Sequence, residues 1–231
     1  RSQPLSRDGV NFLDQGMKSS DFTTRTDSPE LQFRHDIKKK KIHGFLDHPG
    51  TTFRRYANQN NLPARYARSI AFYKNGETQK AVELVDKLIN SQPNNPYFHE
   101  LKGQILYEAG KLKQSIAPYR KSVAIAPNEP LLQIGLATSL LSLENKSSAE
   151  EALGILKKAL RIEEDNMTAF YQMATAYALL GDTGRAELAT AERYYILGNI
   201  KKASMHAHRA MKYLPKNSPE WLKAQDIMAN L

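Results

Sequence analysis

The sequence SIAFYKNGETQKA at residues 69–81 and the sequence GQILYEAGKLKQS at residues 103–115 are two copies of one pattern, 34 residues apart. The offset aligns Gly76 with Gly110 and brings the prolines that close the two units into register. In each copy a helix-period apolar pattern ends near the glycine and a second one begins just after it. A glycine can adopt a left-handed turn between antiparallel helices, so the pattern predicts a helix-turn-helix repeat.

The spacing of later glycines extends the repeat and changes it near the C-terminus. Gly181 follows the second repeat glycine by 71 residues, which is two units of 34 plus three extra residues. We expect the extra residues in a loop at 144–148, with Ser148 opening the next helix in a capping box. Gly198 follows after only 17 residues, so the helix at about 184–197 is expected to belong to two helix pairs at once.

The repeated positions resemble a tetratricopeptide repeat. The first copy carries the small residues, the aromatic residue, the glycine and the closing proline of that pattern at Ser69, Ala71, Phe72, Gly76, Ala81 and Pro93. The second copy has Gly103, Leu106, Gly110, Ser115, Tyr119 and Pro127, and a weaker third copy has Ala174, Ala176, Tyr177, Gly181 and Ala186. The resemblance covers residues 62–215 and predicts an all-α fold, an α-solenoid of tetratricopeptide-like helix-turn-helix repeats with terminal capping helices. Such repeats are scaffolds, and what they bind differs from one protein to another.

Composition excludes several classes of function. The chain has no cysteine, which rules out disulfides, thiolate catalysis and cysteine zinc sites. Its longest apolar runs are far shorter than the roughly 20 residues that cross a bilayer. The net charge of +9 is spread along the chain, with 11 Lys/Arg against 7 Asp/Glu in residues 1–60 and 22 against 17 in the remainder. An even excess favours acidic partners over a nucleic-acid patch.

The chain divides into four parts by composition and pattern. Residues 1–27 are rich in Ser, Asp and Thr and are expected to be the poorly ordered tail end of an upstream domain. Residues 28–61 are predicted to hold an N-terminal helix that ends near Leu46, followed by a linker. The repeats fill 62–215, and 216–231 is predicted to be a C-terminal capping helix. Because the chain begins at Arg1 rather than Met, we expect it to be a piece of a longer protein.

A second resemblance covers nearly the whole chain. The ordered motifs are DSPE at 27–30, RH at 34–35, KIHGFL at 41–46, PARYAR at 63–68, PYFHELKGQ at 96–104 and SPEWL at 218–222. They are similar to the C-terminal tetratricopeptide region of bacterial periplasmic zinc metallopeptidases of the H-E-x-x-H family, related to the beta-barrel assembly-enhancing protease. The resemblance implies a periplasmic location and a region that docks unfolded substrates, outer-membrane assembly components or its own upstream peptidase domain.

The catalytic part of that family is expected to lie upstream of this chain. An H-E-x-x-H motif places two zinc-binding histidines one helical turn apart, whereas here His99 and Glu100 are followed by Gly103 in the second histidine position. We therefore expect no active site, metal or cofactor in this chain, and zinc only in the suspected peptidase domain. Gln3 and Gly9 stand where the family usually has a histidine and an arginine, which leaves the activity of the parent protease open.

The tetratricopeptide resemblance also implies which residues face a partner. In such arrays the first helix of each pair lines a concave groove, and its register selects Tyr66, Ile70, Tyr73, Tyr97, Glu100, Gln104, Tyr107 and Tyr171. Tyrosine suits binding because it offers a large apolar contact and a hydroxyl at small entropic cost. The same tyrosines could instead pack between repeats, and the protein itself could fill part of the groove.

Two other functions fit the sequence. The chain could be a free-standing adaptor whose N-terminal helix caps the array. It could also be a basic module that binds nucleic acid or anionic lipid, since residues 38–41 are four consecutive lysines on a predicted helix. The favoured interpretation is a non-catalytic scaffold that binds protein or peptide segments, without nucleic acid and without a transmembrane segment.

Overall fold

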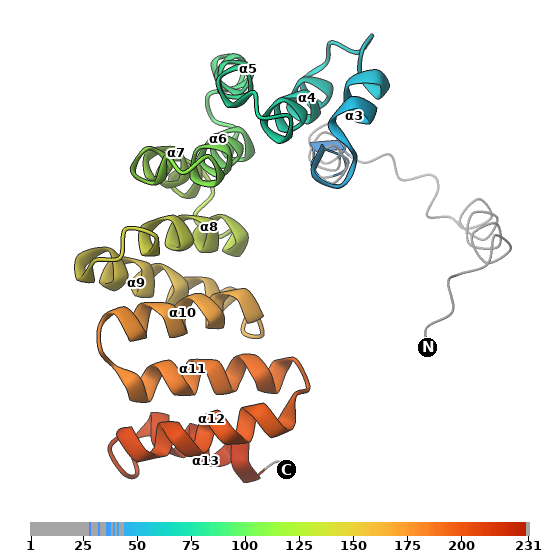
Figure 1. Ribbon diagram of the computed structural model, residues 1–231. Coiled ribbons are helices and arrows are strands. Elements are labelled where there is room, and N and C mark those ends of the chain that lie inside the picture. The colour runs from blue at the N-terminus through green and yellow to red at the C-terminus, as the bar shows by residue number, and fades with distance from the viewer. Residues whose placement is uncertain are drawn as a thin grey trace, which may run out of the picture.

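The computed structural model describes residues 28, 32, 36, 37, 39, 41 and 44–229. The regular elements among these residues are all helices. Their bounds are α3 Pro49–Arg55, α4 Leu62–Lys74, α5 Thr78–Ser91, α6 Pro96–Glu108, α7 Leu112–Ile125, α8 Pro130–Leu141, α9 Lys146–Ile162, α10 Met167–Leu179, α11 Thr183–Ile196, α12 Ile200–Tyr213 and α13 Pro219–Ala229. Helices α4 to α13 stack in one curved column, as the α-solenoid prediction requires (Figure 1). Over the described residues, no helix is both long enough and apolar enough to span a bilayer.

The helix pairs turn where the repeated glycines predicted. Gly76 and Gly110 have φ of 79° and 74°, in the left-handed region that favours glycine. At the first turn the N–H of Gly76 donates to Tyr73 O and the N–H of Glu77 donates to Phe72 O, both at 2.9 Å. These two hydrogen bonds close the end of α4 in a Schellman motif and reverse the chain into α5.

In the third pair, α8 and α9, the predicted loop at 144–148 is wrong, because the second helix begins before residue 148. Helix α9 begins at Lys146, because the side chain of Asn145 accepts the N–H of Ser148 at 3.0 Å and acts as the N-cap. Ser148 therefore lies in the first turn of the helix and does not cap it. The turn before it uses Glu144 at φ 51° in place of a glycine.

Neighbouring pairs pack through Tyr119, whose ring lies between two glycines of different helices. A Cβ on Gly103 of α6 would come within 2.7 Å of this ring, and a Cβ on Gly135 of α8 within 2.8 Å. Tyr119 is only 6% exposed, so α6, α7 and α8 meet around one aromatic side chain. Because Gly103 and Gly135 have no side chain, the backbones of α6 and α8 can approach the Tyr119 ring closely.

Helix α11 belongs to two pairs, as the short glycine spacing predicted. It packs against both α10 and α12, and Figure 1 shows the three helices as successive antiparallel layers. Beyond α12, α13 covers the end of the column, where Ala224 and Ile227 are buried against Leu188 and Ala207. The Ser218 hydroxyl accepts the N–H of Trp221, which caps α13 at its start.

The N-terminal part contains more helix than a linker would. The described residues from 32 to 46 are helical, and this helix ends before Asp47 as expected. His48 then caps α3, since its Nδ1 accepts the N–H of Gly50 at 3.2 Å, and Pro49 starts the helix. Proline is favoured in the first turn because no partner awaits its missing N–H there. Residues 1–27, including Gln3 and Gly9, lie outside the described residues.

Candidate functional site

The concave side of the first two pairs is occupied by the chain's own N-terminal residues. We call the described residues 36, 37, 39, 41 and 44–47 the cover segment. Ile37 is 2% exposed and joins the apolar cluster that contains Tyr66, Ile70 and Phe98. Gly44 is buried, and a Cβ there would lie 2.9 Å from Ile70 Cβ. The cover segment therefore lies directly on α4, with its apolar side toward the repeats.

Two lysines fasten the cover segment to the first helices of the pairs. Lys41 Nζ lies 2.7 Å from Glu100 Oε1 of α6. From the other direction, Lys74 Nζ at the end of α4 donates to the carbonyl oxygens of Phe45 and Asp47, each at 2.6 Å. Carbonyls at a helix end have no partner within the helix, and a cation satisfies them. One clamp thus comes from the segment and the other from the repeats.

Three of the predicted groove residues are covered by this contact. Tyr66 and Ile70 are 0% exposed and Glu100 is 9% exposed, so at these residues the groove is filled by the protein itself, one of the two alternatives that the sequence left open. The physical reason is that the cover segment buries its own apolar residues on the same face. Burial raises the pKa of the Tyr66 phenol well above its ordinary value, and the carboxylate of Glu100 adds to the effect.

Polar atoms remain without partners under the cover segment. The hydroxyl of Tyr66 and Oε2 of Glu100 are buried there, Oε1 of Gln104 is buried one turn further along α6, and no protein group in the described part of the chain hydrogen-bonds to these three atoms. An unpaired buried polar atom costs about 1–3 kcal/mol, so this interface is not optimal.

The groove opens at the C-terminal ends of α4 and α6. Tyr73 is half-buried, and burial together with a hydrogen bond to Glu108 raises the pKa of its phenol to about 12. Gln104 donates to Glu108 Oε1 at 2.8 Å. Tyr107 is also half-buried and packs against an apolar cluster with part of its ring. Tyr73, Gln104, Tyr107 and Glu108 form a polar and aromatic rim beside the cover segment. Tyr97 is half-buried at the opposite, N-terminal end of α6 and is not part of this rim.

Tyr171 lies at a separate place on the concave side. It belongs to α10 and is 53% exposed, with the guanidinium of Arg193 5.3 Å from the centre of its ring. Leu131, at the start of α8, is 72% exposed. The eight predicted residues therefore do not form one continuous open surface. They divide into a covered part, a rim, Tyr97 at the start of α6 and the distant Tyr171.

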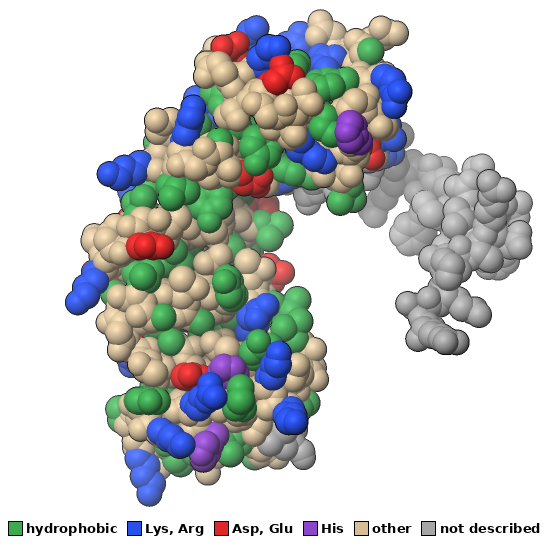
Figure 2. All heavy atoms as spheres, in the orientation of Figure 1, with side chains coloured by type: hydrophobic (Ala, Val, Ile, Leu, Met, Phe, Trp, Pro, Cys, Tyr) green, Lys and Arg blue, Asp and Glu red, His purple; other side chains and the backbone are tan. Residues whose placement is uncertain are grey.

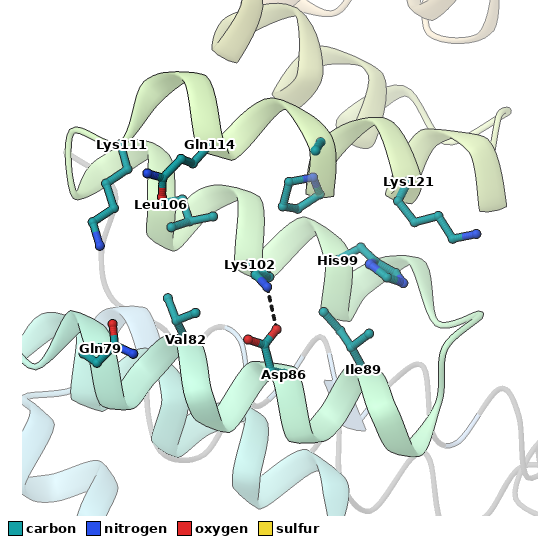
Figure 3. Close-up of a pocket in the computed structure, with 12 residues that line it drawn as sticks. Gln79, Val82, Asp86, Ile89, His99, Lys102, Leu106, Lys111, Gln114 and Lys121 are labelled. Carbon is teal, nitrogen blue, oxygen red and sulfur yellow. Dashed lines mark hydrogen bonds and ion pairs between the residues drawn. The ribbon is translucent and has the colours of Figure 1, made fainter.

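A cleft that the sequence did not indicate lies on the other side of α6 (Figure 3). It has a volume of about 580 Å³ and opens between α5 and α7. Val82, Ile89 and Leu106 contribute apolar side chains, and Lys102 Nζ lies 2.6 Å from Asp86 Oδ1 across it. That ion pair joins α6 to α5, so these two charged side chains in the lining of the cleft already pair with each other.

Nowhere in the described part of the chain do three His, Asp or Glu side chains gather as a metal site would require. His99 Nε2 lies 2.8 Å from Pro93 O, and its neighbour Glu100 is held by Lys41. Both side chains thus have structural contacts. The arrangement can hold polypeptide through apolar and hydrogen-bonding contacts, which is the chemistry of a scaffold.

Comparison with known proteins agrees with this fold. A sequence model of the tetratricopeptide repeat matches residues 66–130. The chain is 26% identical over 174 residues to the TPR repeat-containing protein MJ1428 of Methanocaldococcus jannaschii, and the match covers 71% of this chain but only 27% of that protein. The chain thus spans about a quarter of that relative.

Solved structures share the architecture at low sequence identity. YrrB, described as a TPR protein with an unusual peptide-binding site, superposes with a TM-score of 0.56 at 14% identity, covering 75% of this chain and 90% of YrrB. MamA from Desulfovibrio magneticus RS-1 gives 0.55 at 14% identity, covering 73% of this chain and 92% of MamA. TTC0263 from Thermus thermophilus gives 0.50 at 19% identity, covering 73% of this chain and 100% of TTC0263. The fold is therefore an α-solenoid of tetratricopeptide repeats.

Proposed function

We propose that this chain holds helical segments of other polypeptides in its concave groove. The cover segment is the observation that carries the proposal. Its buried Ile37, its Lys41 paired with Glu100 and its carbonyls bound by Lys74 form the contacts that a bound amphipathic helix would make. Helix-in-groove recognition uses an apolar stripe for affinity and flanking charges for register. The peptide-binding site named for YrrB supports the same use of the fold.

The finer proposal is that the chain is the docking region of a periplasmic zinc metallopeptidase. The ordered motifs at 27–30, 41–46, 63–68, 96–104 and 218–222 support it. The substrates or assembly components would then enter the groove beside the cover segment, and zinc would be bound only in the upstream domain. The parent reading frame tests this: an H-E-x-x-H motif upstream of residue 1 is expected, and a frame without one would leave a free-standing adaptor.

A capture experiment tests the groove itself. The chain is immobilised and exposed to periplasmic extract, beside a variant with alanine at the rim residues Tyr73, Gln104 and Tyr107. A matched control carries alanine at Gln114, Tyr195 and Tyr213, which lie outside the predicted groove set. We expect the same identified envelope proteins on the wild type and the control and their loss from the rim variant.

A competing peptide sharpens the result. A synthetic peptide of residues 28–47 should displace proteins captured by a chain that begins at residue 48, once circular dichroism has shown that this shorter chain is helical, because the peptide carries the residues that occupy the groove. Equal capture by the rim variant and the control, together with no displacement by the peptide, would contradict binding in the groove.

A further inference from the structure

The C-terminal end of the concave side carries a concentration of positive charge that the even overall balance hides. Between residues 193 and 216 there are six Lys/Arg and two His, and no Asp or Glu. Most of these bases lie on α12, where Lys201, Lys202, Arg209 and Lys212 are all exposed. Figure 2 shows blue and purple side chains gathered over α11 and α12. A surface of one sign of charge attracts ligands of the opposite sign.

The cations here are held on aromatic rings. The Arg193 guanidinium lies 5.3 Å from the ring centre of Tyr171 and 5.5 Å from that of Tyr194. Lys202 Nζ lies 5.1 Å from the Tyr194 ring centre, and the same ring stacks on His206 at 5.5 Å. Ring contact restricts the motion of long cationic side chains, so less entropy is lost when they bind an anion. Lys202 is exposed and Arg193 is half-buried, so an anionic group can reach the charged ends of both side chains.

A shallow cleft lies beside these cations, between α10, α11 and α12. Its volume is about 440 Å³, and its lining includes Ala174, Ala178 and Ala186. The hydroxyls of Thr175 and Thr190 also line it, but each donates to the carbonyl four residues earlier in its own helix. The cleft therefore presents both polar and apolar surface, and its three alanines suit contact with small aliphatic side chains.

One acidic group stands at the edge of the cleft. Glu187 Oε2 lies 2.5 Å from His206 Nδ1, and Glu187 Oε1 lies 3.9 Å from Arg209. A carboxylate among the cations repels the closely spaced phosphates of a nucleic acid or a lipid surface. A polypeptide can avoid this repulsion, because its backbone N–H groups can hydrogen-bond to the carboxylate while its acidic side chains reach the bases.

We propose that this face, which we call the basic face, binds an acidic polypeptide segment that carries small aliphatic side chains. Carboxylates of the segment contact Arg193, Lys202 and Arg209, and its small side chains enter the cleft beside Ala178. The inference rests on the proposed function, because it assigns a partner chemistry to a second part of the same concave side. It does not involve the rim at α4 and α6, so the two can fail separately.

The test measures binding of a fluorescent peptide of alternating Glu and Ala to the full chain by anisotropy, at low and moderate salt. The test variant replaces three bases of the basic face with glutamine: Arg193, Lys202 and Arg209. The control variant removes the same charge from three exposed lysines elsewhere: Lys87, Lys113 and Lys158. We expect roughly tenfold or greater weakening in the test variant and less than about twofold change in the control, since specific charge contacts outweigh long-range attraction.

Further arms separate the remaining explanations. The double variant Lys202→Gln with Arg209→Gln changes only exposed side chains and should still weaken binding, with unchanged helix content by circular dichroism. The rim variant should bind the acidic peptide like the wild type, which separates this proposal from the proposed function. Equal weakening in the test and control variants, or tighter binding to a single-stranded oligonucleotide or anionic vesicles than to the peptide, would overturn the proposal.

Discussion

Lys41 Nζ lies 2.7 Å from Glu100 Oε1, across 59 residues of sequence. The pair joins the cover segment to the first helix of the second repeat, where Glu100 is 9% exposed. If the cover segment shifted, Glu100 would stay buried without its cation, and its desolvation would no longer be offset. The ion pair therefore favours this one position of the segment. The cover segment therefore already occupies this part of the groove.

Removal of Lys41 should destabilise the protein more than removal of both partners. We expect Lys41→Met to lower the free energy of unfolding by about 1–3 kcal/mol, because Glu100 is left buried and unpaired. Adding Glu100→Gln should recover part of the loss. Urea denaturation of the two single variants and the double variant gives the coupling. Additive losses would mean that the two side chains do not interact.

Two glycines with opposite surroundings give a matched test of the packing around Tyr119. Gly135→Ala places a Cβ 2.8 Å from the Tyr119 ring, and such overpacking should cost about 1–3 kcal/mol. Gly154→Ala lies in α9 with nothing within 4 Å and should stabilise by up to about 1 kcal/mol, because alanine favours helix. The melting temperatures of both variants are compared with that of the wild type. Equal shifts in the two variants would contradict the close approach at Gly135.

The start of α9 can be located by a pair of cap substitutions. Asn145→Ala should cost about 1 kcal/mol, since it removes the acceptor of the Ser148 N–H. Ser148→Ala should be close to neutral, because that residue lies within the first turn. Denaturant midpoints of the two variants give the comparison. A larger loss at Ser148 would restore the capping box expected from the sequence.

Alkaline titration tests the rim of the groove. Tyr73 should ionise near pH 12, above the usual value of 10.0, because burial and Glu108 favour its neutral phenol. A raised pKa in the folded state stabilises the protein below pH 10.0, and this contribution is lost as the pH rises from there through about 12. Tyrosinate absorbance of the wild type and Tyr73→Phe isolates the group, and Glu108→Gln should lower its pKa. An ordinary pKa in the wild type would contradict the contact.

Much of the fold could be predicted because its signals are local. The turns at Gly76 and Gly110 follow from glycine spacing, and the double use of α11 follows from the short interval before Gly198. The start of α9 could not be predicted as easily, because both Asn145 and Ser148 are good cap residues. Only the hydrogen bond shows which residue acts as the cap.

The site was harder to predict than the fold. The helical register places Tyr66, Ile70 and Tyr73 on one face of a helix, but register says nothing about what covers that face. The spacing of Ile37 and Phe45 indicates an apolar stripe without naming the surface that it meets. Long-range packing decides which surface the stripe meets. Here it buries two predicted contact residues, Tyr66 and Ile70, in an apolar cluster.

Whether the concave groove holds an amphipathic helix is tested most directly by a peptide affinity. A labelled peptide of residues 28–47 is titrated with a chain that begins at residue 48, after circular dichroism has established that the shorter chain is helical. We predict one-to-one binding with a dissociation constant on the order of micromolar. Binding should weaken for a peptide with Ile37→Glu and Lys41→Glu, and the full chain should bind little peptide because its groove is already filled. Equal binding of both peptides, or equal binding to both chains, would contradict a groove that holds a helix.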